Sequence, residues 1–386
     1  MRAEIDPFHA IGISTLAHRL QAEGRSVIHM EFGQPSTGAP KAAIARAHEV
    51  LDAEPGGYWE SPALRERIAR HYQERYGVTV EPERVIVTCG ASPALVLALA
   101  SSFSPGDRVA TARPGYVAYR NNLKALHMVP VEVASGHEDR YQMTAAHLAA
   151  LDPAPAGLIL ASPANPTGTI IEPEELAKIA QVCRERGIRI ISDEIYHGLS
   201  YVAPARSMLE FEPDTLVVNS FSKYFSMVGW RLGWLLAPKK DLARARAYVG
   251  NLFLTAPSMS QHAALAAMDA VDELEGHVAV YRVNRELLLA ALPSLGLKEI
   301  APPDGAFYIY ADIAHLTDDS LSFCKDLLRE TGVATAPGVD FDPVEGRHFI
   351  RISFAVSTAQ VREAIDRLVP WFKARNASAA VARAEA

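Results

Sequence analysis

The sequence predicts an α/β fold, in which a mostly parallel sheet of about seven strands lies between helices. The stretch from Ala161 to Ile188 is typical of such folds. Pro173 opens a helix with one apolar face, Gly187 ends that helix, and a β-branched run follows at once. A strand, a helix and a second strand in this order form a crossover, which requires neighbouring strands to be parallel. Similar units recur along most of the chain.

Runs of apolar and β-branched residues are the expected strands of this sheet. They are Arg84–Thr88, Arg108–Ala112, Met128–Val133, Gly157–Ala161, Ile188–Ser192, Thr215–Asn219 and Leu232–Leu236. Helices are expected before and between them, at about residues 8–24, 39–53, 62–76, 91–103 and 173–186. From about residue 261 to about residue 292 the pattern is helical again and includes one long helix.

The C-terminal part of the chain predicts a smaller α+β domain. Short strands are expected at Gly305–Tyr310, Gly332–Ala336 and Phe349–Ala355, followed by a helix at about residues 359–372. A chain of 386 residues is too long for one small core. We predict a large domain over residues 41–285 and a small domain formed by residues 1–40 together with residues 286–386. The alanine-rich tail, residues 374–386, is expected to fray.

Composition excludes several classes of function. The net charge is -7 and no cluster of lysine and arginine offsets it, which argues against a nucleic-acid partner. Cys89, Cys183 and Cys324 are widely spaced, which argues against a disulfide framework or a zinc site. The N-terminal residues lack the apolar core of a secretion signal, and no apolar run is long enough to span a membrane. We therefore expect a cytoplasmic protein that binds neither membranes nor nucleic acids.

The stretch from Ser220 to Arg231 has the most distinctive chemistry. It places Lys223 just past an expected strand and close to Phe225 and Trp230. Burial among apolar side chains lowers the pKa of a lysine and makes its amine a nucleophile for a carbonyl. The guanidinium of Arg231 suits a phosphate. These residues together suit an aldehyde that carries a phosphate, as pyridoxal phosphate does. Alternatively, the stretch from Ser220 to Arg231 is a loop with a packed arginine and no cofactor.

Polar residues also follow the other expected strands, and the carboxyl ends of parallel strands meet at one edge of a sheet. They are Gly90, Ala91 and Ser92 at a helix N-terminus, Asn165, Asp193 and Tyr196, and Ser220 and Ser222. A helix N-terminus binds anions, a carboxylate keeps a pyridine nitrogen protonated, and a phenol and an amide tune a ring oxygen. Taken singly, Asp193 would more often be a helix cap, and Asn165 part of a turn. Tyr196 would be a core residue, and Glu194 with His197 lacks the partners of a metal site.

In this order the motifs resemble those of the class I/II aminotransferases of pyridoxal phosphate fold type I, the aspartate aminotransferase superfamily. The matching segments are Gly33-Gln34-Pro35, Pro62-Ala63-Leu64-Arg65-Glu66, Thr88-Cys89-Gly90-Ala91-Ser92, Pro105-Gly106-Asp107, Pro114-Gly115-Tyr116, Asn165-Pro166-Thr167-Gly168, Ser192-Asp193-Glu194-Ile195-Tyr196, Ser220-Phe221-Ser222-Lys223, Gly229-Trp230-Arg231 and Arg351-Ile352-Ser353-Phe354. They cover nearly the whole chain, and as a set they are highly specific.

The resemblance implies a role for each matching residue. Lys223 would form a Schiff base with the cofactor and move the substrate proton, and Asp193 would pair with the pyridine nitrogen. The other implied positions are Tyr196 and Asn165 at the ring oxygen, Tyr116 stacked on the ring, Gly90, Ala91, Ser92, Ser220, Ser222 and Arg231 at the phosphate, and Arg351, Asn165 and Gly33 at the substrate carboxylate.

One segment departs from the family pattern. In the family, a tyrosine that reaches the cofactor phosphate of the partner subunit precedes a small loop with its own glycine. Here the segment from Gly57 to Leu64 is shorter, and that glycine is missing. The resemblance therefore names Tyr58 as a cofactor contact but leaves open whether the shorter loop lets it reach the partner.

The resemblance implies a homodimeric transaminase that moves an amino group from an L-amino acid to a 2-oxo acid. Two alternatives share the same cofactor residues. The first is a pyridoxal phosphate-dependent carbon–sulfur β-lyase, which would release pyruvate and ammonia without an acceptor. The second is a non-catalytic, cofactor-sensing domain of a transcription regulator. It is disfavoured because this chain enters the aminotransferase pattern almost at once and is negatively charged.

The identity of the amino donor does not follow from these motifs. No second arginine can be assigned to the distal carboxylate of a dicarboxylic substrate. Residues 8–13, Tyr58-Trp59 and Phe253-Leu254 are apolar or aromatic and weakly indicate an apolar pocket.

Overall fold

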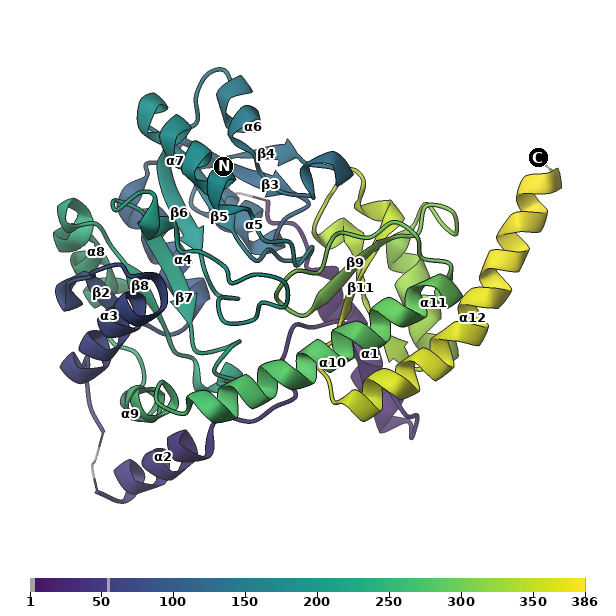
Figure 1. Cartoon of the computed structure of the whole chain (residues 1–386), viewed down its shortest axis with the longest axis horizontal. Coiled ribbons are helices and arrows are strands. Elements are labelled where there is room, and N and C mark those ends of the chain that lie inside the picture. Colours follow the sequence, from purple (N-terminus) through teal and green to yellow (C-terminus); the bar gives the residue numbers. More distant parts are fainter. Residues whose placement is uncertain (1–3, 54–55, 386) are drawn as a thin grey trace.

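The computed structural model describes residues 4–53 and 56–385. Within them the main sheet has seven strands (Figure 1). Their spatial order is β2 (Val85–Thr88), β8 (Gly233–Leu236), β7 (Leu216–Ser220), β6 (Arg189–Asp193), β5 (Gly157–Ala161), β3 (Arg108–Arg113) and β4 (Val129–Ala134). Strand β8 is antiparallel to both of its neighbours, and the other pairs are parallel. The predicted mostly parallel sheet is thereby confirmed.

Helices cover both faces of the main sheet. Neighbouring residues of β6 show this, because Ile190 packs against α6 (Ala145–Ala150) and α7 (Pro173–Arg186), whereas Ile191 packs in the opposite layer. That layer contains α4 (Ala91–Ser102), α5 (Val117–Ala125) and α8 (Lys239–Leu252). Strands that are buried on both faces are mostly apolar, which is why runs such as β5 and β8 were visible in the sequence.

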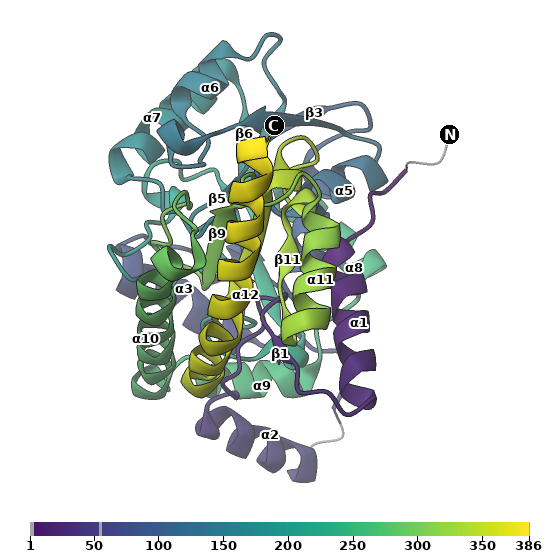
Figure 2. The same cartoon turned by 90° about the vertical axis from the view of Figure 1, so that its right-hand side faces the viewer.

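A second group of elements brings the two ends of the chain together. Strand β12 (Phe349–Ser353) pairs antiparallel with β9 (Tyr308–Asp312) and β11 (Ala336–Pro337). The N-terminal strand β1 (Ile28–His29) pairs in parallel with β10 (Val333–Ala334). Figure 2 shows α1 (His9–Ala22), α11 (Ser320–Thr331) and α12 (Thr358–Glu385) next to one another. Residues far apart in sequence therefore build one small layer of their own.

Long helices connect the two groups. Helix α10 (Val271–Leu295) runs from the large sheet to the small one and packs along α12 (Figure 1). It passes the predicted boundary at residue 285 without interruption, and the division into residues 1–40, 41–285 and 286–386 stays a prediction. Helices α2 (Lys41–Ala53), α3 (Pro62–Tyr76) and α9 (Ser258–Ala267) complete the large group, and α2 packs on α9.

The C-terminal tail continues the last helix. Helix α12 extends to Glu385, so residues 374–385 are helical, and residue 386 lies outside the described residues. The fraying expected of this tail stays a prediction. Alanine is the best helix former, and Asn376 ties this part of the helix to the body of the protein. Its side chain donates a hydrogen bond to the carbonyl of Leu295 (3.0 Å) and accepts one from His315 (3.1 Å).

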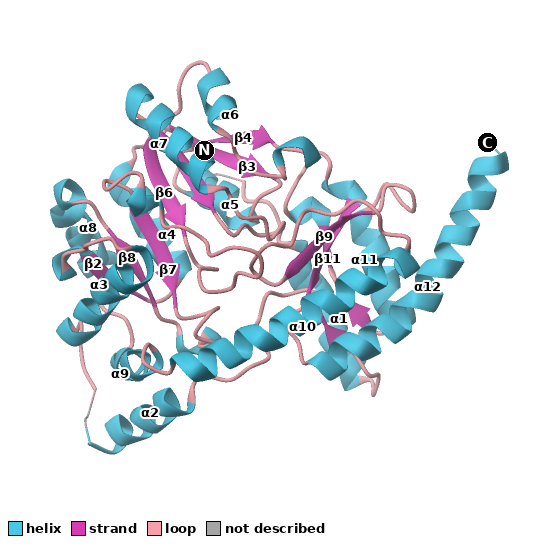
Figure 3. Ribbon diagram, in the orientation of Figure 1, coloured by secondary structure: helices cyan, strands magenta, loops and turns pink. Residues whose placement is uncertain are grey.

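Figure 3 shows loops filling the space between the main sheet and the small sheet, at the end to which the arrows of β6 and β7 point. Residues that follow these strands are therefore brought close to β9 and β12. None of the helices in the described residues is long and apolar enough to cross a membrane.

Candidate active site

A cavity of about 260 Å³ lies where the carboxyl ends of the main strands meet the small sheet. Most of the residues predicted for the site line it: Gly33, Ala91, Ser92, Tyr116, Asn165, Asp193, Tyr196, Ser222, Lys223, Arg231 and Arg351. Gly90, Ser220 and Tyr58 do not line it. The parallel topology explains the convergence, because Asp193 and Lys223 follow neighbouring strands and so lie at the same edge.

Lys223 lies three residues beyond the end of β7. Its amine donates a hydrogen bond to the carbonyl oxygen of Gly33 (Nζ···O 2.6 Å). Burial, together with the positive charges of Arg351 and Arg231, lowers the pKa of Lys223 to about 8. An amine with such a pKa is partly unprotonated near neutral pH and can attack a carbonyl carbon.

Asp193 is the last residue of β6 and is buried. One carboxylate oxygen accepts a hydrogen bond from the Tyr119 hydroxyl (2.7 Å), and the other accepts one from the backbone N–H of Ile195 (3.1 Å). Burial raises the pKa of Asp193 to about 6, against the effect of these hydrogen bonds and of Lys223. The carboxyl group is therefore mostly ionised at neutral pH and can hold a positive charge beside it.

Tyr119 was missed by the sequence reasoning. A signal existed, because Tyr116 and Tyr119 are three residues apart and residues at that spacing share one face of a helix. The two rings meet edge to face with centroids 5.5 Å apart. Tyr116 lines the cavity, and the hydroxyl of Tyr119 contacts Asp193.

Replacing Tyr119 with phenylalanine should raise the pKa of Asp193, because the hydroxyl stabilises the ionised form. A hydrogen bond to a charged group is strong enough to shift this pKa by about one unit. With a higher pKa, the Asp193 carboxylate becomes protonated at a higher pH, and activity is lost there. We therefore expect the acid limb of kcat/KM against pH to move upward in Tyr119→Phe and to stay in place in the surface control Tyr248→Phe. An unchanged acid limb would contradict the expectation.

Arg351 is buried and held on every side. Its Nη1 donates to the side-chain oxygen of Asn165 (2.8 Å), and its Nη2 donates to the backbone carbonyl of Glu31. The guanidinium lies between the rings of Tyr308 and Phe341, with centroid distances of 4.4 and 4.6 Å. Its Nε has no hydrogen-bond partner within residues 4–53 and 56–385. A fixed guanidinium that borders the cavity is suited to a carboxylate.

The side chain of Arg231 lies beside the N-terminus of α4. The N-cap residue of α4, Gly90, has φ +106°, and a Cβ built on it would lie 2.6 Å from Nη2 of Arg231. Glycine at this position therefore lets the guanidinium approach the helix N-terminus, where backbone N–H groups and the helix dipole favour negative charge. Ser220 does not line the cavity, and its hydroxyl accepts a hydrogen bond from the backbone N–H of Ser222 (3.1 Å).

The remaining predicted contacts lie elsewhere. Tyr58 is 85% exposed and does not reach this cavity. Trp59 stacks on His262 with ring centroids 4.8 Å apart. Of the three segments that suggested an apolar pocket, only Phe8 lines the cavity. Apolar residues that the sequence did not single out join it, namely Phe32, Leu95 and Ile195.

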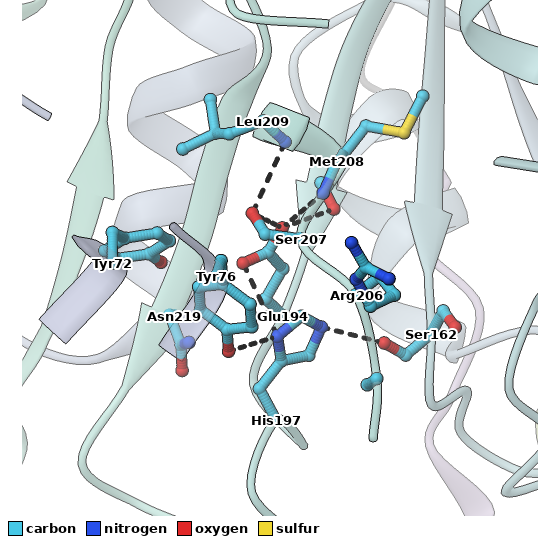
Figure 4. A network of polar contacts seen from close by, with 12 residues as sticks. Tyr72, Tyr76, Ser162, Glu194, His197, Arg206, Ser207, Met208, Leu209 and Asn219 are labelled. Carbon is cyan, nitrogen blue, oxygen red and sulfur yellow. Dashed lines mark hydrogen bonds and ion pairs between the residues drawn. The ribbon is translucent and has the colours of Figure 1, made fainter. Parts of the chain in front are cut away.

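Behind Asp193, Glu194 and His197 form a buried polar network (Figure 4). His197 accepts a hydrogen bond from the Tyr76 hydroxyl (2.7 Å) and donates one to the carbonyl of Ser162 (2.9 Å), three residues before Asn165. Glu194 accepts hydrogen bonds from residues 207–208 (2.9 and 3.0 Å). Burial raises the pKa of Glu194 to about 8 and lowers that of His197 to about 4. Both groups are then largely neutral at pH 7, and the network anchors the segment that carries Asn165.

The groups around the cavity match pyridoxal phosphate part by part. An amine of lowered pKa suits its aldehyde, a buried carboxylate suits its pyridine nitrogen, and a phenol with an amide suits its ring oxygen. The N-terminus of α4, with the Arg231 guanidinium beside it, suits its phosphate. The fold and the site therefore define an enzyme that uses this cofactor.

The chain belongs to the class I and II aminotransferases, whose family model matches residues 25–368. It is 45% identical to the valine–pyruvate aminotransferase of Mycobacterium tuberculosis over 96% of this chain and 97% of that one. Its fold matches the crystal structure of an aminotransferase from M. tuberculosis with a TM-score of 0.93 and 44% identity, covering 96% and 97% of the two chains. A putative aminotransferase from Silicibacter pomeroyi matches with a TM-score of 0.91 and 45% identity, covering 96% and 98%. The protein is thus a pyridoxal phosphate-dependent transaminase.

Proposed function

We propose that this transaminase takes its amino group from L-amino acids with apolar side chains and passes it to a small 2-oxo acid such as pyruvate. The wall of the cavity beside the polar groups carries the proposal. It is formed by Phe8, Phe32, Leu95 and Ile195, and Phe8 packs edge-on against Phe32 with ring centroids 6.2 Å apart. The naming of a similar M. tuberculosis enzyme as a valine–pyruvate aminotransferase supports the same donor class.

Charge supports this donor class as well. Among the described residues that line the cavity, the basic side chains are Lys223, Arg231 and Arg351. Each of them has a proposed task at the aldehyde, the phosphate or the α-carboxylate. A second substrate carboxylate would then lie against apolar side chains without a partner, and burying an unpaired charge is costly.

The geometry of the cavity supports a proposed role for each polar residue. When bound, pyridoxal phosphate supplies an aldehyde for an amine and a ring that accepts electrons from the substrate α-carbon. Arg351 binds the substrate carboxylate and so fixes the orientation of the α-carbon. Lys223 is the group that takes the α-proton and returns it, since its amine is partly unprotonated near neutral pH. Asp193, Tyr196 and Asn165 hold the ring, and Ser92, Ser222 and Arg231 hold the phosphate.

We also infer a homodimer in the cytoplasm. Tyr58 lies on the surface with most of its side chain exposed, so its hydroxyl is free to act outside its own subunit. A monomer in sedimentation experiments on the loaded protein would contradict the dimer. Tyr58→Phe should then weaken cofactor binding only if the side chain reaches the phosphate of the partner subunit.

The donor class can be tested by mixing the loaded protein with single L-amino acids and no 2-oxo acid. Valine should bleach the cofactor absorbance at least about tenfold faster than aspartate, since burying the unpaired side-chain carboxylate of aspartate against apolar residues is costly. Pyruvate should then restore the absorbance. If aspartate reacted faster than valine, the proposed donor class would be wrong. Release of pyruvate and ammonia from cysteine without an acceptor would favour a carbon–sulfur β-lyase.

A further inference from the structure

Tyr308 joins three parts of the site that no motif connects. It is the first residue of β9, is 1% exposed and lines the cavity. Its ring lies against the guanidinium of Arg351, with 4.4 Å between the ring centroid and the central carbon. Its hydroxyl lies 2.7 Å from the hydroxyl of Tyr196. A Cβ built on Gly33 would lie only 1.7 Å from the Tyr308 oxygen, so glycine is required there.

The antiparallel pairing of β9 with β12 produces this arrangement. Arg351 lies opposite Tyr310, and Tyr308 is two residues along the same strand, on the same face. Long side chains reach such diagonal neighbours. Phe341 covers the other side of the guanidinium at 4.6 Å, so Arg351 stays against the Tyr308 ring.

The charge of Arg351 acts on the Tyr308 hydroxyl. Burial raises the pKa of Tyr308, and Arg351 opposes that rise. A positive charge beside a phenol makes its O–H a stronger hydrogen-bond donor, and hydrogen bonds in a chain strengthen one another. Either hydroxyl can donate in the Tyr196–Tyr308 pair. When Tyr196 donates its single proton to the ring oxygen of the cofactor, it accepts from Tyr308, and this second hydrogen bond makes Tyr196 a stronger donor. A carboxylate that neutralises Arg351 weakens both donors.

We propose that Tyr308 is a positioning residue that transmits the binding of a substrate carboxylate at Arg351 to Tyr196. The proposal rests on the functions proposed above for Arg351 and Tyr196. Asn165 forms a separate connection, because it accepts a hydrogen bond from Arg351 directly (2.8 Å). The Tyr308 connection therefore carries part of the coupling between the carboxylate site and the ring oxygen site.

The coupling has a predictable sign. A donor at the ring oxygen stabilises its negative charge and so disfavours protonation of the attached Lys223 nitrogen. When a carboxylate neutralises Arg351, Tyr196 donates less strongly, and the pKa of the attached nitrogen rises. The bound cofactor reports this protonation through its visible absorbance, and the measurement is independent of turnover.

The test uses the loaded protein and isovalerate, a carboxylate with an apolar chain and no amine. Absorbance is recorded across pH with and without isovalerate for the wild type, Tyr308→Phe and Tyr310→Phe. Tyr308→Phe keeps the ring against Arg351 and removes only the hydroxyl. Tyr310→Phe is the matched control, since the Tyr310 hydroxyl is buried without a hydrogen-bond partner in the described part of the chain, and its ring stacks on Phe349.

Isovalerate should raise the titration midpoint of the wild type and of Tyr310→Phe by about one pH unit, as expected when an adjacent charge is neutralised. In Tyr308→Phe the shift of the midpoint caused by isovalerate should be about half as large. In a Tyr196→Phe background the removal of the Tyr308 hydroxyl should have no further effect, because the connection passes through Tyr196.

Equal shifts in all three proteins would overturn the proposal, and so would the absence of a shift in the wild type. A further reduction by Tyr308→Phe in the Tyr196→Phe background would also overturn it. Each of these results would leave the proposed transamination intact if valine still bleached the cofactor. Failure of valine to do so would contradict the proposed donor, whatever the titrations show.

Discussion

Lys223→Ala is expected to abolish covalent attachment of the cofactor and to lower the rate of amine transfer by about 10²- to 10⁴-fold, the size of a lost acid–base group. The variant removes both the nucleophile for the aldehyde and the group that moves the α-proton. Borohydride reduction of the loaded wild type followed by peptide mass mapping should place the cofactor on the peptide that contains Lys223. Lys178→Ala, which alters an exposed lysine on α7, is the control. Cofactor trapped on another lysine in the wild type would refute the assignment.

The lowered pKa of Lys223 adds a pH dependence to this result. With a pKa of about 8, roughly a tenth of the amine is unprotonated at pH 7, compared with less than a thousandth for an ordinary lysine. Only the unprotonated amine attacks the aldehyde. The rate of cofactor attachment to the apoprotein should therefore rise with pH up to about 8 and then level off. A rate that keeps rising above pH 10 would mean that burial does not lower this pKa.

Asp193→Asn is the second substitution with a large expected effect, and its neighbour supplies the control. Asp193, with a pKa of about 6, is mostly ionised at pH 7, whereas Glu194, with a pKa of about 8, is mostly neutral. Asp193→Asn therefore removes a negative charge, whereas Glu194→Gln replaces one neutral group with another. We expect kcat to fall by about 10³-fold in Asp193→Asn, as when one preorganised electrostatic contact is lost. In Glu194→Gln, kcat should fall by less than about tenfold.

The comparison of these two variants is measured as kcat at saturating donor, with thermal unfolding as a check on folding. Both side chains are buried, so a loss that came only from damage to the core would affect both variants. If Glu194→Gln were as inactive as Asp193→Asn at the same stability, the charge on Asp193 would not be what matters.

Much of the fold could be predicted because it depends on local patterns. Strands β5 to β8 of the main sheet are covered on both faces, so their apolar runs are nearly continuous and end close to the predicted residues. The helical tail shows a contact that is not local, while its expected fraying stays a prediction. Asn376 contacts Leu295, which is 81 residues away, and composition alone carries no sign of that contact.

By itself, the sequence determined the class of the fold, the cofactor and the candidate residues at the strand ends. A parallel sheet brings those ends together whatever the rest of the chain does, which is why Asp193 and Lys223 could be placed in one site. Only the tertiary structure decided what surrounds them. Arg351 donates to the carbonyl of Glu31 across 320 residues, and Tyr308 meets Tyr196 across 112. Such contacts arise from the packing of one sheet against another, and no local pattern encodes them.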